Sequence, residues 1–123
     1  MVLVDTSVWV EHFRSGNARL ETLLYDGHVV CHSFIIGELA CGNLKQRSDL
    51  LSLLRALPMA IHAEHEEVMQ LIENYTLMGK GLGYVDMHLL ASAMLTNDLL
   101  WTLDKRLKDA SLTLGIGYPY RTS

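Results

Sequence analysis

The stretch that decides the fold is Val2-Leu3-Val4-Asp5, three apolar residues that run directly into an aspartate. An uninterrupted apolar run of this kind is typical of a strand buried on both faces, as in a parallel sheet. A second apolar run at residues 99–102 is followed by Leu103 and Asp104. Functional groups in open α/β sheets gather at the carboxyl ends of the strands. Asp5 and Asp104 are therefore predicted to lie at one edge of a parallel sheet.

Short apolar runs alternate with longer helical periodicities along the rest of the chain, which predicts an α/β domain with a parallel sheet. Further strands are expected at 28–31, 59–61 and, less clearly patterned, 112–116, which makes about five strands in a small doubly wound sheet. Helices are predicted at 7–13, 17–25, 33–41, 48–57, 64–78, 85–95 and 104–109, with Ser7 and Ser33 as possible N-caps. No linker or repeat interrupts residues 1–123, so a single domain is expected.

The composition narrows the class of protein without choosing a function. Half of the residues are apolar and 20% are charged, which is ordinary for a globular protein and excludes disorder. The net charge of −4 argues against a passive nucleic-acid binder, although an enzyme with acidic metal ligands remains compatible with it. Cys31 and Cys41 have no metal-ligand spacing and are expected to be reduced, packed thiols. With no signal peptide and no membrane-spanning stretch in the pattern, we expect a soluble, cytoplasmic protein that does not bind membranes.

Four acidic residues occupy places that a hydrophobic core normally rejects. Asp5 and Asp104 follow apolar strands, Glu38 lies within the apolar stretch 34–41, and Asp86 shares a helical stripe with apolar residues. An ionised carboxylate on a buried face costs several kcal/mol, as an order of magnitude, unless it is paired or bound to a metal. No cation occurs on those faces. The four acids are therefore predicted to share a metal pocket, although Glu11 has a similar setting.

Each acid also has a simpler structural interpretation. Asp5, Asp86 and Asp104 lie near predicted helix starts, where an aspartate can cap the helix or interact with its dipole. Glu38 could face solvent. All four being caps or surface residues together is the less favoured interpretation.

The segment Val4-Asp5-Thr6-Ser7-Val8-Trp9 resembles the opening motif of bacterial PIN-domain ribonucleases, the VapC-type toxins of toxin–antitoxin systems. Glu38, the segment Gly83-Tyr84-Val85-Asp86 and the segment Leu100-Trp101-Thr102-Leu103-Asp104 resemble the remaining acidic positions of that family. The order, spacing and length agree from Met1 to about Tyr118. One such motif is weak evidence, whereas the ordered set of four is specific.

This resemblance implies a three-layer α/β/α fold and an endoribonuclease that hydrolyses RNA phosphodiester bonds with Mg²⁺ or Mn²⁺. It makes Asp5, Glu38 and Asp86 the expected metal ligands, direct or through water, and Asp104 an outer or second-site ligand. Thr6, Ser7 and Thr102 could hydrogen-bond these carboxylates or the phosphate, and ordinary capping or packing is the alternative. Proteins of this type commonly cut structured RNA such as transfer or ribosomal RNA, form homodimers and bind a small antitoxin.

Other polar and aromatic residues have less specific patterns. The pairs His62/His65 and His28/His32 lack a third soft ligand, so a zinc site is not favoured, and His88 is expected to be solvated. Five basic residues follow the Glu38 and Asp104 segments and could bind RNA phosphates or simply form solvated faces: Lys45, Arg47, Lys105, Arg106 and Lys108. Trp9 and Trp101 are expected to pack in the core rather than to stack on bases. The leucine-rich helix 48–57 could receive an amphipathic antitoxin helix or serve only the core.

Three other functions are compatible with an aspartate after the first strand. A haloacid-dehalogenase-type phosphotransferase needs a second aspartate two residues on, where this chain has Ser7. A response-regulator receiver needs adjacent acids after its first strand and a lysine after its last, and neither is present. A non-catalytic RNA-binding or protein-interaction module on a degenerate PIN fold remains the main alternative. The presence of all four acids speaks against it.

Overall fold

A computed structural model describes residues 1–119 and shows three parallel strands surrounded by seven helices. The strands are β1 (Val2–Val4), β2 (Val29–Val30) and β3 (Leu99–Trp101), in the order β2-β1-β3. Val2 pairs with Val29 on one side and with Leu99 on the other. The central strand is almost completely buried, as its unbroken apolar sequence predicts.

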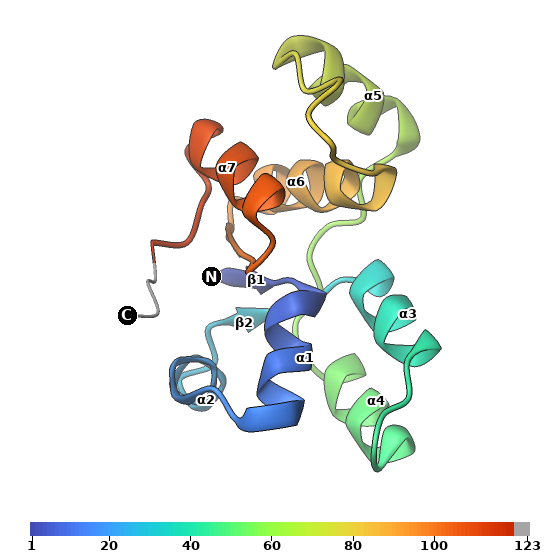
Figure 1. The fold of residues 1–123 in the computed structure, drawn as a ribbon, viewed down its shortest axis with the longest axis vertical. Helices are drawn as coiled ribbons and strands as arrows, with labels where there is room; N and C mark the ends of the chain where they lie inside the picture. Colours follow the sequence, from blue (N-terminus) through green and yellow to red (C-terminus); the bar gives the residue numbers. More distant parts are fainter. Residues whose placement is uncertain (120–123) are drawn as a thin grey trace.

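Helices cover both faces of this sheet (Figure 1). The helices α1 (Thr6–Ser15) and α2 (Ala18–Tyr25) lie on one side. The helices α6 (Tyr84–Thr96) and α7 (Lys105–Thr113) lie on the other side, and α5 (His65–Asn74) packs on α6. The helix α3 (Ser33–Cys41) and its neighbour α4 (Arg47–Arg55) form a helical hairpin that contacts α1 through α3. The expected α/β class with a parallel sheet is confirmed.

The expected number of about five strands is wrong for the described residues. Residues 59–61 contribute only an isolated bridge between Met59 and Cys31, and Gly117 contributes another beside Leu100. The predicted strand 112–116 is absent because α7 continues to Thr113, beyond the expected end at residue 109. Both segments meet the sheet edge at a single residue, so neither forms a ladder long enough to be a strand.

Local sequence signals explain most helix ends. Asn17 caps α2 by accepting a hydrogen bond from the backbone N–H of Leu20 at 2.9 Å. A capping box begins α5, in which the Glu67 side chain accepts from the backbone N–H of Glu64. Asn97, in the left-handed conformation with φ 59°, ends α6. The predicted caps Ser7 and Ser33 are instead the second residue of α1 and the first of α3. The N-cap positions are Asp5, whose side chain makes no capping hydrogen bond, and His32, whose side chain accepts from the backbone N–H of Phe34.

One apolar core joins the sheet to the surrounding helices, and it includes the buried Trp9 and Trp101, as expected. Cys31 is buried in it, and burial raises the pKa of its thiol to about 11. Cys41 is exposed at the end of α3, so the expectation that both thiols are packed is wrong for Cys41. Within residues 1–119, no helix has both the length and the apolar character that crossing a bilayer requires.

Candidate active site

Asp5 lies directly after β1, and two hydroxyl groups hold its buried carboxylate. Ser7 Oγ donates to Asp5 Oδ2 at 2.8 Å, and Thr102 Oγ1 donates to the same oxygen at 2.7 Å. The backbone N–H of Asp5 donates to the carbonyl of Trp101, which continues the pairing of β1 with β3. The carboxyl ends of the two strands therefore fix Asp5 in position, as expected for functional groups in a parallel sheet.

Glu38 joins this region through Thr6, the first residue of α1. Thr6 Oγ1 donates to Glu38 Oε1 at 2.9 Å, across the contact between α1 and α3. Glu38 is exposed, so the expectation that it projects from a buried face is wrong. The reason is that α3 buries only Ile35 and Leu39 fully, which leaves the Glu38 side of the helix open.

Asp86 is half-buried in the first turn of α6, where its Oδ2 accepts a hydrogen bond from the backbone N–H of Gly83 at 3.1 Å. Burial raises the pKa of the Asp86 carboxyl above its ordinary value, and the negative charges of Asp5 and Asp104 raise this pKa further. The Gly83 hydrogen bond opposes that shift. Asp86 therefore lies within electrostatic reach of both strand-end aspartates.

Asp104 is exposed and caps α7, since its Oδ1 accepts from the backbone N–H of Leu107 at 3.0 Å. Its own backbone N–H donates to Thr102 Oγ1 at 3.1 Å, and this is the hydroxyl that also holds Asp5. The capping interpretation of Asp104 is thus correct. The same arrangement connects Asp104 to the Asp5 network, so capping and a place beside the other acids are compatible.

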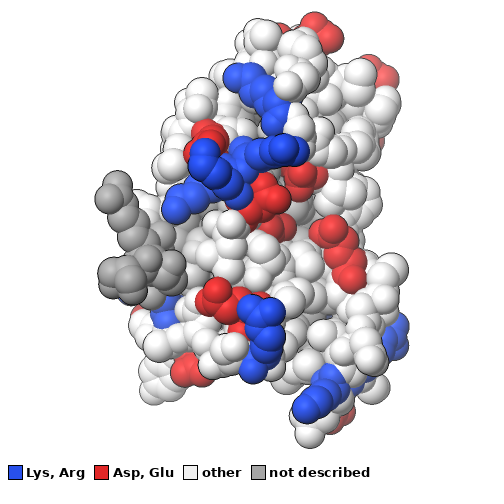
Figure 2. All heavy atoms as spheres, viewed as in Figure 1, with Lys and Arg blue, Asp and Glu red and all other residues white. Residues whose placement is uncertain are grey.

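The four acids have no basic partner among residues 1–119. The ion pairs in this part of the chain join the N-terminus to Asp98 and Lys105 to Asp109. In each of the four carboxylates one oxygen accepts the hydrogen bonds described above, and within residues 1–119 the other oxygen has no hydrogen bond. Acidic side chains gather across the middle of the face in Figure 2, with Lys and Arg side chains above and below. Oxygen donors with excess negative charge fit a hard divalent cation.

A second polar cluster consists of His32, His62 and His88. One ring nitrogen from each histidine lies within 4.8 Å of one from each of the others. Within residues 1–119, this is the group of three His, Cys or acidic side chains whose ligand atoms lie close enough together to hold a metal ion. The two histidine pairs considered from the sequence, His62/His65 and His28/His32, did not predict this grouping. His88 is only 2% exposed, so the expectation that it is solvated is wrong. His88 lies on α6, a helix that is buried on almost every side, and its ring contacts that of Phe34 on α3.

Both ring nitrogens of His32 are engaged in hydrogen bonds, which argues against a role as a metal ligand. Its Nδ1 accepts from the backbone N–H of Phe34 at 3.0 Å, so the neutral ring carries its proton on Nε2. That nitrogen lies 3.0 Å from Ser92 Oγ and donates to it. Burial, followed by the neighbouring His88 and His62, lowers the pKa of His32 to about 4, which keeps the ring neutral. We therefore interpret this cluster as a structural connection between α3 and α6, and not as a zinc site.

Ser92 is the central residue of that connection and was missed by the sequence analysis. Its buried hydroxyl also accepts from the backbone N–H of Ala63 at 3.1 Å and lies 3.4 Å from His88 Nδ1. A serine four residues after a histidine in an otherwise apolar helix is the signal that could have identified it. The connection holds the helix that carries Asp86 against the helix that carries Glu38.

Three of the basic residues proposed to bind phosphate have structural contacts. The Arg47 guanidinium donates to the carbonyl of Ala40 near the end of α3, at 3.0 and 3.2 Å. Lys105 pairs with Asp109 one turn along α7. Arg106 packs against Gly81, where an added Cβ would meet Arg106 Nη1 at 2.6 Å. Arg47 is therefore committed to the α3–α4 connection, whereas α7 presents an exposed basic face beside Asp104.

Comparisons with known proteins agree with this architecture. The profile of the PIN domain family matches residues 2–112. Ribonuclease VapC32 from two strains of Mycobacterium tuberculosis is 48% identical over 117 residues, which is 94% of each chain. The crystal structure of M. tuberculosis VapC20, described as a Sarcin-Ricin loop cleaving toxin, superposes with a TM-score of 0.64 at 18% identity, covering 89% of this chain and 95% of that one. The chain therefore belongs to the PIN-domain family.

Proposed function

We propose that the protein is an endoribonuclease, the toxin of a type II toxin–antitoxin pair, that hydrolyses RNA with Mg²⁺ or Mn²⁺. The observation that carries the proposal is that the four carboxylates converge without a basic partner. No Lys, Arg or His side chain forms an ion pair with any of them within residues 1–119. Burial, and then the charges of Asp5 and Asp104, raise the pKa of Asp86. The similarity to Ribonuclease VapC32 over nearly the whole chain supports the same activity. A non-catalytic module would not need these acids together.

Asp5, Glu38 and Asp86 would hold the metal, directly or through water, and Asp104 would act from the outer edge. A bound Mg²⁺ or Mn²⁺ supplies charge neutralisation at the phosphate and lowers the pKa of water. The chain's own contribution is orientation. Ser7 and Thr102 fix Asp5, and Thr6 fixes Glu38, each by a hydroxyl that donates to one oxygen and leaves the other for the cation.

The expected substrate is a structured RNA, such as transfer or ribosomal RNA. The phosphate backbone would lie across the carboxylates, with the exposed basic residues Lys105 and Arg106 on α7 beside it. Because α7 begins at Asp104, the same turn that brings an acid to the site also brings these cations next to it. Location in the cytoplasm and assembly into a homodimer belong to the same proposal.

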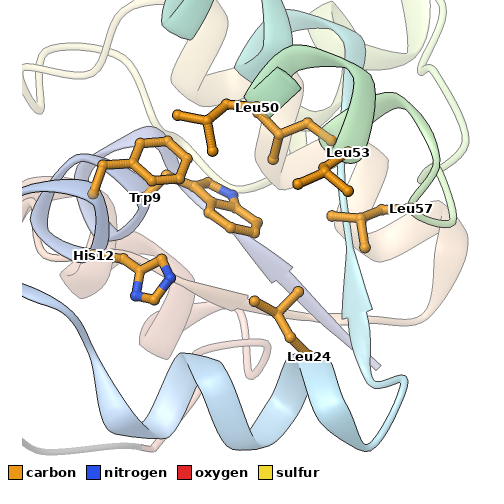
Figure 3. A pocket seen from close by; sticks show the side chains of 8 residues that line it. Trp9, His12, Leu24, Leu50, Leu53 and Leu57 are labelled. Carbon is orange, nitrogen blue, oxygen red and sulfur yellow. The ribbon is translucent and has the colours of Figure 1, made fainter. Parts of the chain in front are cut away.

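The antitoxin is proposed to bind an apolar groove between α4 and the helices α1 and α2. Leu50, Leu53 and Leu57 line one side of this groove, and Trp9 and Leu24 face them (Figure 3). Leu53 is 67% exposed and adds its apolar surface to the groove, so the groove is a contiguous apolar surface and not a single exposed side chain.

The chemistry of the groove favours an amphipathic helix with acidic residues. A neighbouring hollow shares Phe13 and Leu50 with the groove and has Arg14 and Lys45 in its lining. An apolar helix face would fill the leucine side, and acidic residues on the same helix would meet the two cations. The leucine-rich helix would then serve both the core, through Leu51 and Leu54, and the partner.

Metal dependence tests the catalytic part of the proposal. The purified protein should cleave RNA in Mg²⁺ or Mn²⁺, and cleavage should stop on addition of EDTA and return when excess metal restores the cation. The control is the same preparation carrying Asp5→Asn, which should be inactive under all conditions. Cleavage that persists in excess chelator contradicts the carboxylate–metal mechanism.

A further inference from the structure

A row of aromatic rings lies between the facing ends of α3 and α6. The ring of Phe34 is 5.0 Å from that of His62 and 4.5 Å from that of His88, measured between ring centroids. His88 is in turn 6.0 Å from Tyr84, which is 5.6 Å from His65. We call the solvent-accessible part of this row, formed by Phe34, His62 and Tyr84, the aromatic patch.

The aromatic patch has a rigid base. The buried His32 and His88 lie behind it and are held by Ser92. Burial, with the neighbouring His88 and His62, lowers the pKa of His32 to about 4, so the His32 ring is neutral at physiological pH. The exposed members are His62 and Tyr84, the latter 44% exposed, with Phe34 half-buried between α3 and the histidines. Flat aromatic rings with polar groups at their edges suit a nucleobase better than a phosphate.

The aromatic patch is adjacent to the acids of the active site on both helices. Phe34 and Glu38 are four residues apart on α3, so they lie on one face of this helix about 6 Å apart. Tyr84 and Asp86 both belong to the first turn of α6. A ligand that reaches Glu38 and Asp86 with its phosphate is therefore within one nucleotide of the patch.

The charges set a direction for that ligand. The exposed cations Lys105 and Arg106 belong to α7, which lies on the opposite side of β1 from α3 in Figure 1. The sugar-phosphate backbone would pass from these cations to the carboxylates, and the next base would reach the aromatic patch.

We propose that Phe34, His62 and Tyr84 form a stacking site for one unpaired nucleobase of the RNA, next to the phosphate held at the carboxylates. This inference rests on the proposed ribonuclease function and adds a specificity to it: the base beside the cleaved bond is flipped out or single-stranded, not paired. The Tyr84 hydroxyl, which lies 2.9 Å from His65 Nδ1, is held at the edge of the patch where the edge of a base would be.

Photo-crosslinking tests the location directly. The probe is an oligouridylate of about 12 nucleotides containing 5-iodouridine, bound in Ca²⁺, which carboxylates ligate through oxygen as they ligate Mg²⁺. Irradiation joins an iodinated base to an aromatic side chain stacked on it, and mass spectrometry identifies the joined peptide. We expect adducts at Tyr84 or His62. Adducts confined to α7, or to exposed tyrosines elsewhere such as Tyr25, overturn the stacking site.

Matched variants test the energetic contribution. Tyr84→Leu should weaken binding of the same oligonucleotide at least about fivefold, since one stacked base contributes a factor of this size or more. Tyr84→Phe keeps the ring and should restore binding. His62→Ala is a second variant; because His62 Nδ1 lies 3.0 Å from Ser33 Oγ and its ring stacks on His32, a thermal melt of the variant accompanies the binding measurement. The control is Tyr25→Leu, because Tyr25 is 92% exposed at the end of α2 and far from the site in sequence.

The outcomes separate this inference from the proposed function. Metal-dependent cleavage with unchanged RNA affinity in both Tyr84→Leu and His62→Ala overturns the stacking site and leaves the ribonuclease intact. Wild-type protein that neither binds nor cleaves RNA overturns the function and the inference together. Equal weakening by Tyr84→Leu and Tyr84→Phe assigns the effect to the hydroxyl and also overturns stacking.

Discussion

At the residue scale, the Thr102 hydroxyl connects the two aspartates that follow the strands. It donates to Asp5, accepts from the backbone N–H of Asp104 and lies 3.3 Å from Ser7 Oγ. Because Thr102 is only 4% exposed, water cannot replace these hydrogen bonds without a change in packing.

We predict that Thr102→Val, which keeps the shape but removes the hydroxyl, destabilises the metal-free protein by about 1–3 kcal/mol, because the buried Asp5 carboxylate loses a donor. The Asp5 carboxylate, left with the Ser7 hydroxyl as its one side-chain donor, would be oriented less firmly, so RNA cleavage should fall at least about tenfold. Urea denaturation and initial rates in Mg²⁺ measure the two effects. Thr113→Val, on an exposed residue of α7, is the control and should change neither.

His32 predicts a dependence of stability on pH. Its pKa is about 4 in the folded protein against 6.5 in the unfolded chain, so between these values the unfolded chain binds a proton that the folded His32 does not. The stability that depends on a neutral His32 is therefore fully present above about pH 6.5 and is lost as the pH falls towards 4. The loss should be on the order of 3 kcal/mol.

The variant that tests this is His32→Asn, which retains an acceptor for the Phe34 N–H but does not titrate. Its free energy of unfolding should fall less steeply than that of the wild type between pH 6.5 and 4, whatever its absolute stability. The control is His28→Asn, on an exposed histidine outside the cluster. Parallel curves for wild type and His32→Asn would show that His32 is not buried in its neutral form.

The sequence predicted the positions of the two strand-end aspartates better than the surroundings of the other candidate residues. Asp5 and Asp104 were placed by one physical rule, the collection of functional groups at strand ends, and both lie there. Glu38 was predicted on a buried face because its helical neighbours are apolar, yet burial depends on what packs against α3. His88 and Ser92 escaped notice because contacts 29 to 60 residues apart in the chain leave no local pattern.

At the element scale, periodicity identified the helices and the central strands but not the sheet edges. The predicted strands at 59–61 and 112–116 correspond to single bridges at Met59 and Gly117. A short apolar run can form a strand, a helix end or a loop that touches the sheet once, and local sequence does not distinguish these. The extension of α7 to Thr113 is an example, since residues 110–113 continue the helix and Gly117 alone reaches β3.

The helix α4 carries the prediction about the partner. Leu53→Glu places a charge in the groove without disturbing the buried Leu51 and Leu54, so metal-dependent cleavage should persist while inhibition by the antitoxin is lost. The measurement is cleavage with and without the cognate antitoxin, after co-expression. Met69→Glu, on the exposed side of α5, should remain inhibited. Inhibition of both variants alike would place the antitoxin elsewhere.

At the scale of the whole molecule, the acid cluster links activity to stability. Burial, and then the charges of Asp5 and Asp104, raise the pKa of Asp86 and oppose folding with this carboxylate ionised, whereas a bound cation would reverse that opposition. The molecule has a net charge of −4 and its acids lie across the middle of one face, between basic groups (Figure 2). A lower stability in the metal-free state would therefore accompany the proposed metal-dependent catalysis.

The most direct test of this account is Asp86→Asn, measured for melting temperature with and without Mg²⁺ and for RNA cleavage. Asparagine keeps the shape and an acceptor for the Gly83 N–H but removes one charge and one good ligand. We predict that the metal-free melting temperature stays level or rises, that the stabilisation by Mg²⁺ shrinks, and that cleavage falls at least about a hundredfold. An active variant that is destabilised by about 1 kcal/mol would show that Asp86 is only a helix cap and would remove it from the metal site.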